Sequence, residues 1–268
     1  MTDVTLYQFR YSHFNEKARW ALDYKGVAHR RVSVLPGVHR GTMKKLSGRT
    51  TTPVLVIDGK VVSNSARIIE ALEQRWPTPA LYPADPAQRA RALKLEEGFD
   101  RSVGPAVRIA LYAEILREGW FLSGLFAESQ PRAARLPYRL AFPLVARLIR
   151  IGYRVDDATV IANAIATCRN ALDFVAREAG PEGYLVGNAF SVADLACAAL
   201  LAPLVNPDHP DMHWPEPYPQ RVRDFLGHWA RHPGAEWVRR CYQHRSGSSV
   251  PVFTSGTPTP ARQQHPGN

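Results

Sequence analysis

The sequence predicts a two-domain protein, in which an α/β N-terminal half is followed by a half made only of helices. Strand-like and helical patterns alternate through residues 1–76. Residues 77–88 hold four prolines and therefore predict a linker. Beyond it, residues 89–245 show helical periodicity and no clear strand pattern. A length of 268 residues also fits two domains.

A strand–helix–strand unit comes first. Residues 5–9 alternate in polarity and are rich in strand-forming side chains, so they predict a strand. Ser12 has the character of a helix N-cap, and Gly26 ends the helix that follows. Residues 31–34 predict a second strand, and the polar, basic residues 36–49 are expected to be irregular.

A hairpin and a helix complete the N-terminal half. Residues 53–57 predict a strand, Asp58-Gly59 a tight turn and residues 60–62 the return strand. Apolar residues then recur at helical spacing as far as Trp76. The order β-α-β followed by β-β-α predicts a thioredoxin-like domain over residues 1–76.

The C-terminal half contains four stretches with helical periodicity, at residues 89–118, 158–179, 192–205 and 219–243. Ser191 and Asp194 have the spacing of a capping box, so we assign them a structural role. Residues 246–268 are rich in Ser, Thr, Pro, Gly and Gln, and we expect a disordered tail there.

The chain is basic, with a formal charge of +10, but its Lys and Arg residues are spread out rather than gathered in long runs. Without zinc-finger spacing or an aromatic RNA-binding box, this charge predicts a basic surface and no specific nucleic-acid partner. The three cysteines are far apart and fit reduced thiols. No apolar leader follows Asp3 and Gln8, so we expect a cytoplasmic protein, and we expect no metal site.

Ser12 is the first candidate for chemistry, because it lies where a strand passes into a helix. A helix N-terminus offers unpaired N–H groups and partial positive charge. A hydroxyl there can donate to a bound thiolate and so lower the pKa of the thiol. The alternative is that Ser12 only caps the helix.

Two later segments can also either contact a ligand or serve only the fold. A cis bond before Pro53 would turn the backbone of Val54 toward a ligand, whereas an ordinary edge-strand proline would not. Ser65 follows a strand at the start of a helix, where its hydroxyl and nearby N–H groups can bind a carboxylate or merely cap the helix.

Taken together, these segments resemble the glutathione transferase family. Residues 11–22, YSHFNEKARWAL, look like the serine motif of the zeta and theta types found in bacteria. Residues 51–73, TTPVLVIDGKVVSNSARIIEALE, resemble the proline-led strand, turn, serine and helix of the family. Residues 184–204 resemble the start of its buried C-terminal helix. The resemblance implies a thioredoxin-like glutathione-binding domain, an all-helical domain, a homodimer and a role in detoxification.

The resemblance also implies site residues. Ser12 would be catalytic by stabilising the glutathione thiolate, and Thr52, Pro53 and Val54 would contact the cysteinyl part. Ser65, with Asn64 beside it, would bind the γ-glutamyl carboxylate. A basic residue of the 39–49 loop would approach the glycyl carboxylate, with the candidates His39, Arg40 and Lys44.

Asn64 and Asn15 depart from the patterns of the family. Asn64 replaces the longer Glu or Gln that often precedes the serine, which disfavours a contact to the γ-glutamyl amine. Asn15 stands where redox relatives carry a second cysteine, which disfavours chemistry through a protein thiol. An apolar acceptor site is expected at the domain boundary, built from Tyr11, His13, Phe14, Tyr112 and Trp120.

Residues 119–157 do not match the compact pattern of the family. A helix starting near Pro143 would carry arginines at positions 147, 150 and 154 beside an apolar side at positions 144, 148 and 151. We favour a helix that covers the second-substrate cleft or packs in a dimer. The alternative is a basic amphipathic segment, residues 138–155, on an anionic membrane surface.

The leading hypothesis is an enzyme with glutathione as co-substrate, which conjugates glutathione to an apolar electrophile or uses it to isomerise or cleave one. The alternative is a non-catalytic protein of the same fold, used for binding or assembly. The Asn64 departure and the unusual insert favour this alternative.

Overall fold

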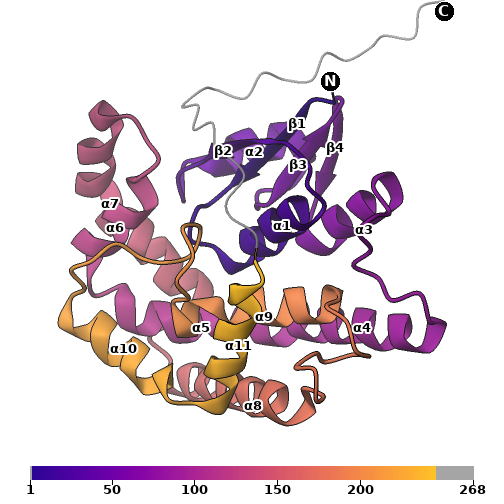
Figure 1. The fold of residues 1–268 in the computed structure, drawn as a ribbon. Helices are drawn as coiled ribbons and strands as arrows, with labels where there is room; N and C mark the ends of the chain where they lie inside the picture. The colour runs from indigo at the N-terminus through magenta and orange to yellow at the C-terminus, as the bar shows by residue number, and fades with distance from the viewer. Residues whose placement is uncertain (1, 246–268) are drawn as a thin grey trace, which may run out of the picture.

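The computed structural model describes residues 2–245, in which a small sheet with flanking helices leads into a set of longer helices (Figure 1). The strands are β1 (Val4–Gln8), β2 (Arg30–Ser33), β3 (Val54–Ile57) and β4 (Lys60–Ser63). They lie in the order β2-β1-β3-β4, with β1 parallel to β2 and antiparallel to β3. The predicted thioredoxin-like half followed by a helical half is confirmed.

Helices cover both faces of this sheet. Adjacent residues of a strand point to opposite faces, so Leu6 and Leu55 pack with α1 (His13–Tyr24) and α3 (Ser65–Arg75). Their neighbours Tyr7 and Val54 pack on the other face with Met43 of α2 (His39–Ser47). The strand pattern therefore sets which helix lies over which face.

The expectation that residues 36–49 are irregular is wrong, because α2 forms within them. Met43 is the one buried residue of α2, and Gly48 ends the helix in the left-handed region with a φ of 73°. A single buried side chain in a basic segment gives no apolar period that a sequence can reveal. The turn at Asp58-Gly59 is as predicted, with φ values of 48° and 82°.

The helical half contains the following elements: α4 (Pro86–Gly98), the π-helical turn η1 (Phe99–Val103), α5 (Gly104–Ile115), α6 (Gly119–Ala127), α7 (Arg132–Tyr153), α8 (Ala158–Glu178), α9 (Val192–Val205), α10 (Gln220–Ala230) and α11 (Pro233–Gln243). α9 lies at the centre, because it is buried all round from Val192 to Leu204. Its apolar sequence on every side is typical of such a helix.

The capping box that begins α9 is confirmed. The carboxylate of Asp194 accepts from the backbone of Ser191 at 2.9 Å and from the backbone of Leu185 at 2.8 Å. Burial raises the pKa of Asp194 to about 6, despite these hydrogen bonds. The residue therefore fixes a loop and a helix start, as its assigned structural role requires.

Several predicted boundaries differ from the structure. α4 begins at Pro86, inside the predicted linker, and the 89–118 stretch is interrupted by η1. The 219–243 stretch is two helices, since the chain turns before Pro233. α7 begins at Arg132 rather than near Pro143, which lies inside the helix. The predicted tail, residues 246–268, lies outside the described residues.

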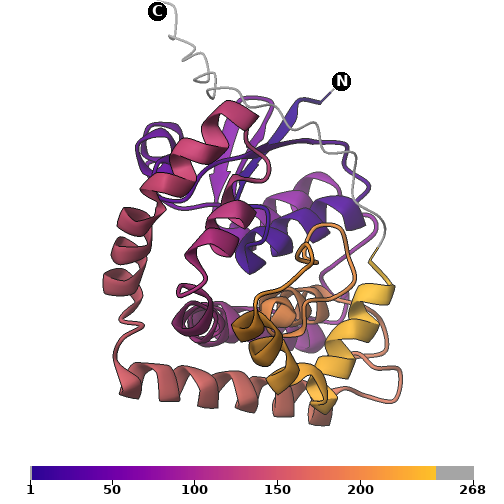
Figure 2. The ribbon, with the colours of Figure 1, turned by 90° about the vertical axis from the view of Figure 1, so that its left-hand side faces the viewer.

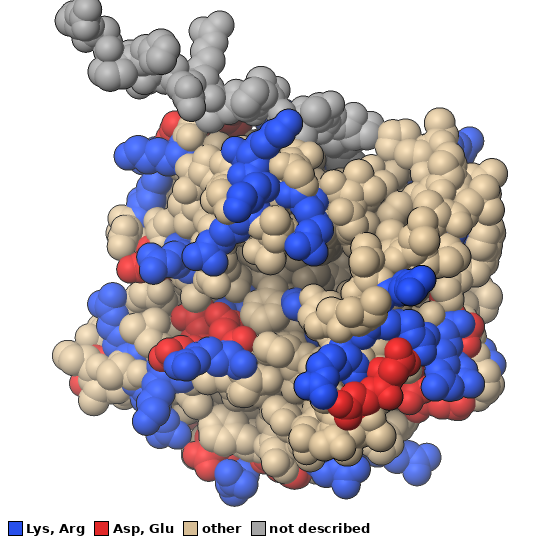
Figure 3. Space-filling view, turned by 180° about the vertical axis from the view of Figure 1, so that it is seen from behind, with Lys and Arg blue, Asp and Glu red and all other residues tan. Residues whose placement is uncertain are grey.

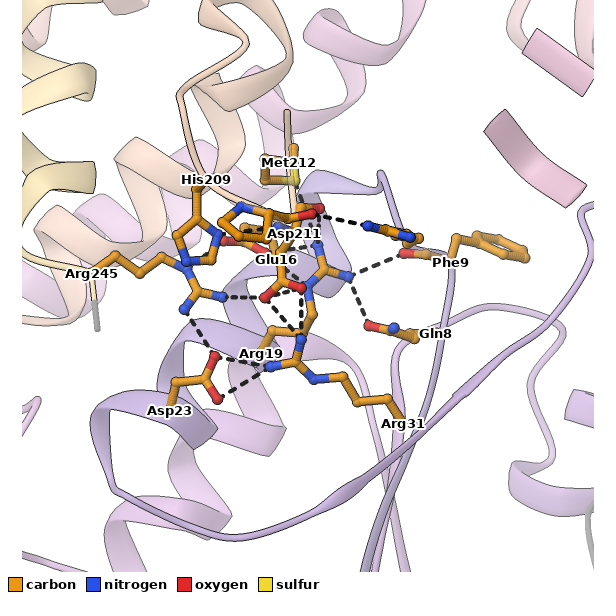
Figure 4. Close-up of polar contacts among 12 residues, drawn as sticks. Gln8, Phe9, Glu16, Arg19, Asp23, Arg31, His209, Asp211, Met212 and Arg245 are labelled. Atoms are coloured by element: carbon orange, nitrogen blue, oxygen red, sulfur yellow. Dashed lines mark hydrogen bonds and ion pairs between the residues drawn. The ribbon is translucent and has the colours of Figure 1, made fainter. Parts of the chain in front are cut away.

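A buried network of charged side chains joins the two halves (Figure 4). It consists of three arginines and three carboxylates: Glu16, Arg19, Asp23, Arg31, Asp211 and Arg245. Arg31 donates to both carboxylate oxygens of Asp211 at 2.7 and 2.8 Å, and Arg245 donates to Asp211 at 2.9 Å. Since Arg31 lies in β2 and Asp211 in the loop before α10, this network fixes one half against the other.

No helix in residues 2–245 is both long enough and apolar enough to cross a membrane.

Candidate active site

A cavity of about 440 Å³ lies between the two halves of the molecule. Its walls come from the segment before α1, the loop before β3, α5, α6 and the second half of α7. Figure 2 shows α7 running along the outer edge of the molecule, beside the sheet domain at one end. In Figure 3 the surface is hollowed near the centre, with Lys and Arg side chains above the hollow.

Ser12 lines this cavity at the N-terminus of α1. It has the extended backbone of an N-cap residue, with a φ of −96° and a ψ of 125°, yet its side chain makes no capping hydrogen bond. The simple capping alternative is therefore wrong for the hydroxyl. The hydroxyl and the first N–H groups of α1 remain available to a group in the cavity.

The loop before β3 reaches the same cavity. Thr52 lines it, and the Thr52–Pro53 peptide bond is cis, which the sequence raised as one of two alternatives. The Thr52 hydroxyl accepts from Nδ2 of buried Asn15 at 3.2 Å, so α1 and this loop are tied together. Pro53 and Val54 do not line the cavity. Contact of Val54 with a ligand stays a prediction.

Asn64, rather than Ser65, caps α3. The Asn64 side chain accepts from the backbone N–H groups of Ala66 and Arg67 at 3.0 and 3.3 Å. Ser65 is 2% exposed, and its hydroxyl has no hydrogen-bond partner. Neither residue lines the cavity, but Asn64 donates its backbone N–H to the carbonyl of Pro53 at 3.4 Å. Ser65 therefore lies next to Asn64, whose backbone hydrogen bond to Pro53 links the start of α3 to the loop before β3.

The basic candidates of the 39–49 segment separate into two groups. His39 and Arg40 line the cavity, whereas Lys44 does not. Nδ1 of His39 is 3.2 Å from the carbonyl oxygen of Leu35, and burial lowers the pKa of His39. His39 is therefore neutral near pH 7, and Arg40 is the cation of this pair.

Tyr11 also lines the cavity, but its hydroxyl is already engaged. It donates to Glu128, whose carboxylate also pairs with Arg10 at 3.1 Å. Burial and the hydrogen bond to Glu128 raise the pKa of Tyr11 well above its usual range. Tyr11 therefore stays protonated, with its proton directed to Glu128.

His13 and Phe14 belong to the boundary between the domains. Nε2 of His13 lies 2.9 Å from the carbonyl oxygen of Gly104, and burial, with nearby Arg108, lowers the pKa of His13 to about 3. A neutral ring that donates to a backbone carbonyl is a structural link. His13 lines the cavity as predicted, whereas Phe14 does not. Phe14 packs so close to Gly104 that a Cβ there would lie 2.5 Å from its ring.

The part of the cavity wall that comes from the helical half carries a positively charged side chain, Arg108. Tyr112, Arg108 and Tyr153 all line the cavity, and Arg108 donates to the Tyr153 hydroxyl at 3.2 Å. Burial raises the pKa of Tyr112 to about 12. Within the described chain no carboxylate forms an ion pair with Arg108. This places a guanidinium beside an aromatic wall, facing a site large enough for a small molecule.

Trp120, also expected at the acceptor site, does not line this cavity. Its side chain is 61% exposed on α6 and lies under the guanidinium of Arg139, 3.5 Å from the ring centroid. The sequence missed Arg108 and Tyr153, because helical periodicity places them on helices but does not reveal which helix faces the sheet domain. It also missed Glu128, which lies in the turn after α6 and meets Tyr11 only in the folded chain.

Comparison with known proteins agrees with this architecture. Residues 6–80 match the glutathione S-transferase N-terminal domain and residues 158–227 the C-terminal domain, which together make up more than half of the chain. The chain is 38% identical over 102 residues to maleylpyruvate isomerase of a Ralstonia species, covering 36% of this chain and 48% of that one. It spans about half the length, or somewhat less, of this and the next such relatives.

A longer but weaker match extends over both halves. The chain is 25% identical over 214 residues to the tetrachloro-p-hydroquinone reductive dehalogenase of Sphingobium chlorophenolicum, covering 75% of this chain and 83% of that one.

Solved structures agree on the fold. A beta-etherase of Sphingobium sp. strain SYK-6 superposes with a TM-score of 0.59 at 22% identity, covering 90% of this chain and 98% of that one. A zeta-class maleyl pyruvate isomerase superposes with a TM-score of 0.58 at 20% identity, covering 92% of this chain and 99% of that one. With its sheet order, its cis proline and both domain matches, the chain belongs to the glutathione S-transferase family.

Proposed function

We propose that this protein is a glutathione transferase-type enzyme, in which Ser12 stabilises the thiolate of glutathione next to an acceptor held in the cavity. The observation that carries the proposal is the Ser12 hydroxyl, which lines the cavity at a helix N-terminus without capping that helix. A hydrogen bond from a hydroxyl to a thiolate, together with the helix dipole, favours the ionised thiol. No protein cysteine is needed for this chemistry.

The rest of glutathione would lie along the end of the sheet. The cysteinyl part would contact Thr52 and the backbone of Val54, beyond cis Pro53. The hydroxyl of Ser65, buried without a partner, would donate to the γ-glutamyl carboxylate. Because the Asn64 side chain already accepts two N–H groups of α3, we do not assign it a contact to the γ-glutamyl amine. Arg40 would pair with the glycyl carboxylate.

The reaction needs no other oxidant or reductant. The thiol proton leaves to solvent, and the sulfur lone pair forms a bond to an electrophilic carbon of the acceptor. In a conjugation the leaving group departs with its bonding electrons. In an isomerisation the new C–S bond later breaks and returns its electrons to sulfur. Holding both reactants in one cavity makes the attack effectively unimolecular.

The acceptor is proposed to be an apolar molecule that carries an anionic group. Leu111, Ile115, Leu122 and Phe126 supply apolar walls, and no carboxylate in residues 2–245 pairs with Arg108, which also lines the cavity. Relatives of this chain are named maleylpyruvate isomerase, maleylacetoacetate isomerase and glutathione S-transferase. Arg108→Leu should raise KM for electrophiles with a carboxylate and leave uncharged electrophiles unaffected.

Ser12→Ala tests the central claim. A hydrogen bond to a charged group contributes about 1.5–3 kcal/mol, so kcat/KM should fall about ten- to a hundredfold. The absorbance of bound thiolate, followed against pH, should show that the substitution raises the pKa of bound glutathione. Ser102→Ala is the matched control, since Ser102 is exposed on η1 and donates to the carbonyl of Gly98. Unchanged turnover and an unchanged thiol pKa in Ser12→Ala would refute the role.

Calorimetric titration of glutathione separates binding from catalysis. Ser65→Ala should weaken glutathione binding. If the titration detects no glutathione binding at any glutathione concentration, the protein is instead a non-catalytic member of the family. We also propose that the protein is a homodimer in the cytoplasm with a role in detoxification. The molar mass in solution tests the homodimer.

A further inference from the structure

The outer side of α7 carries a continuous apolar stripe. Eight large apolar side chains are exposed in residues 2–245, and five of them lie on this one helix. They are Leu136 (56%), Leu140 (69%), Leu144 (69%), Leu148 (67%) and Ile151 (66%). Spacings of four, four, four and three residues place them on one face of a helix. Figure 3 shows mostly uncharged atoms over the side of the molecule where α7 lies.

The stripe is not explained by packing within the chain. The opposite side of α7 is the buried one, where Tyr138 donates to the carbonyl of Pro36 at 3.1 Å and Phe142 packs on Phe126. Val145 and Ile149 face the cavity from the same inner side. The helix thus covers the cavity, which is one of the two roles that the sequence favoured, and still presents a second apolar face to the outside.

The charge of α7 is of one sign. Residues 132–153 contain five arginines and neither Asp nor Glu. Arg150 pairs with Asp156 beyond the helix, but among the described residues no carboxylate pairs with Arg132, Arg135, Arg139 or Arg147. Joining two copies of the chain along this stripe would bring these cations together without compensating carboxylates, which is unfavourable. The charge therefore fits an anionic surface rather than a second copy of the chain.

Trp120 adds a feature typical of membrane interfaces. It is 61% exposed, and Arg139 of α7 stacks over its ring and donates to its carbonyl oxygen at 3.0 Å. Helices that lie in the headgroup region combine leucines and tryptophan on one face with arginines beside them.

We propose that the α7 stripe docks this protein on an anionic membrane surface, with Leu140 and Leu144 inserted among the lipids and Arg132 and Arg147 against the headgroups. Leu148 belongs both to the stripe and to the wall of the cavity. Docking would therefore bring the cavity next to the bilayer, where apolar molecules concentrate. The docking itself does not depend on the proposed catalytic function.

Co-sedimentation of the full chain with vesicles tests this proposal. The protein should bind phosphatidylcholine vesicles that contain phosphatidylglycerol and not vesicles of phosphatidylcholine alone. Each arginine near such a surface contributes about fivefold in affinity, so Arg132→Gln/Arg147→Gln should weaken binding about 25-fold. Arg169→Gln/Arg240→Gln is the matched control, because it removes the same charge from exposed sites on α8 and α11 and should leave binding within about twofold.

Leu140→Ser/Leu144→Ser tests the apolar part. Both side chains are mostly exposed, so the thermal unfolding temperature should be unchanged, while vesicle binding falls more than about tenfold. Quenching of Trp120 by brominated lipids should disappear in Trp120→Phe. The proposal is overturned if the protein fails to bind anionic vesicles at low salt or if both arginine pairs weaken binding equally. It is also overturned if Leu140→Ser/Leu144→Ser turns a dimer into a monomer, because the stripe would then be a contact between copies.

Discussion

Replacing Asp211 with asparagine should strongly destabilise the fold, because this carboxylate lies at the centre of the buried network between the two halves. Its oxygens accept from Arg31 at 2.7 and 2.8 Å and from Arg245 at 2.9 Å, and Arg19 lies 3.8 Å away. In the native protein, three arginines face three carboxylates. The asparagine variant would retain three arginines and two carboxylates, with one positive charge in excess.

The magnitude follows from burial. Removing one partner of a buried ion pair costs about 3–5 kcal/mol, because the remaining charge is left without compensation. Asparagine can still accept one hydrogen bond, so we expect the lower end, about 3 kcal/mol. At about 2–4 °C per kcal/mol for a chain of this size, the melting temperature should fall by about 6–12 °C.

Denaturant and thermal unfolding measure this loss. Asp208→Asn is the matched control, since Asp208 lies in the same loop but is exposed, and it should change stability by less than about 0.5 kcal/mol. In a double-mutant cycle, Arg31→Gln should be less damaging in the Asp211→Asn background than in the native protein. A loss below about 1 kcal/mol for Asp211→Asn would refute the reasoning, since the cost of burying these charges would then cancel their attraction.

The same network predicts a pH dependence. Burial alone would raise the pKa of Asp211, but Arg19, Arg31 and Arg245 together hold it well below its usual range. A carboxyl whose folded pKa is depressed stabilises the fold above its unfolded pKa of about 3.9, and this stabilisation is lost as the pH falls through the folded value. The stability difference between the native protein and Asp211→Asn should therefore shrink below about pH 4.

Three further outcomes test the site and the boundary between the domains. Gly104→Ala should destabilise the protein by about 1–3 kcal/mol in denaturant unfolding, because the added Cβ would lie 2.5 Å from the Phe14 ring, and Phe14→Leu should restore part of the loss. The ring of His13, followed by NMR, should stay neutral down to about pH 4, since its pKa is lowered to about 3, and a midpoint near pH 6 would contradict its buried contact to Gly104. Trp120→Ala should leave kcat/KM within about twofold, and a larger effect would return Trp120 to the acceptor site.

The sequence determined the local features of this protein. The alternation of strand and helix patterns, the Asp58-Gly59 turn and the Ser191–Asp194 capping box depend on residues close together in the chain, and the structure has all of them. Local patterns also identified Ser12 as the residue where a strand passes into a helix. The sequence did not predict α2, because only one residue of this helix, Met43, is buried and a single buried residue gives no helical period.

Only the tertiary structure decided what depends on distant residues meeting. Asp211 and Arg31 are far apart in sequence, yet they form a buried pair because the loop before α10 folds back onto β2. Arg108 faces the cavity, and Trp120 faces outward, because packing fixes how each helix is rotated about its axis. The apolar residues of α7 could have served the core, a dimer or the surface, since periodicity defines a face and not what covers it. The fold shows that the inner side of α7 covers the cavity and that its leucine stripe stays exposed.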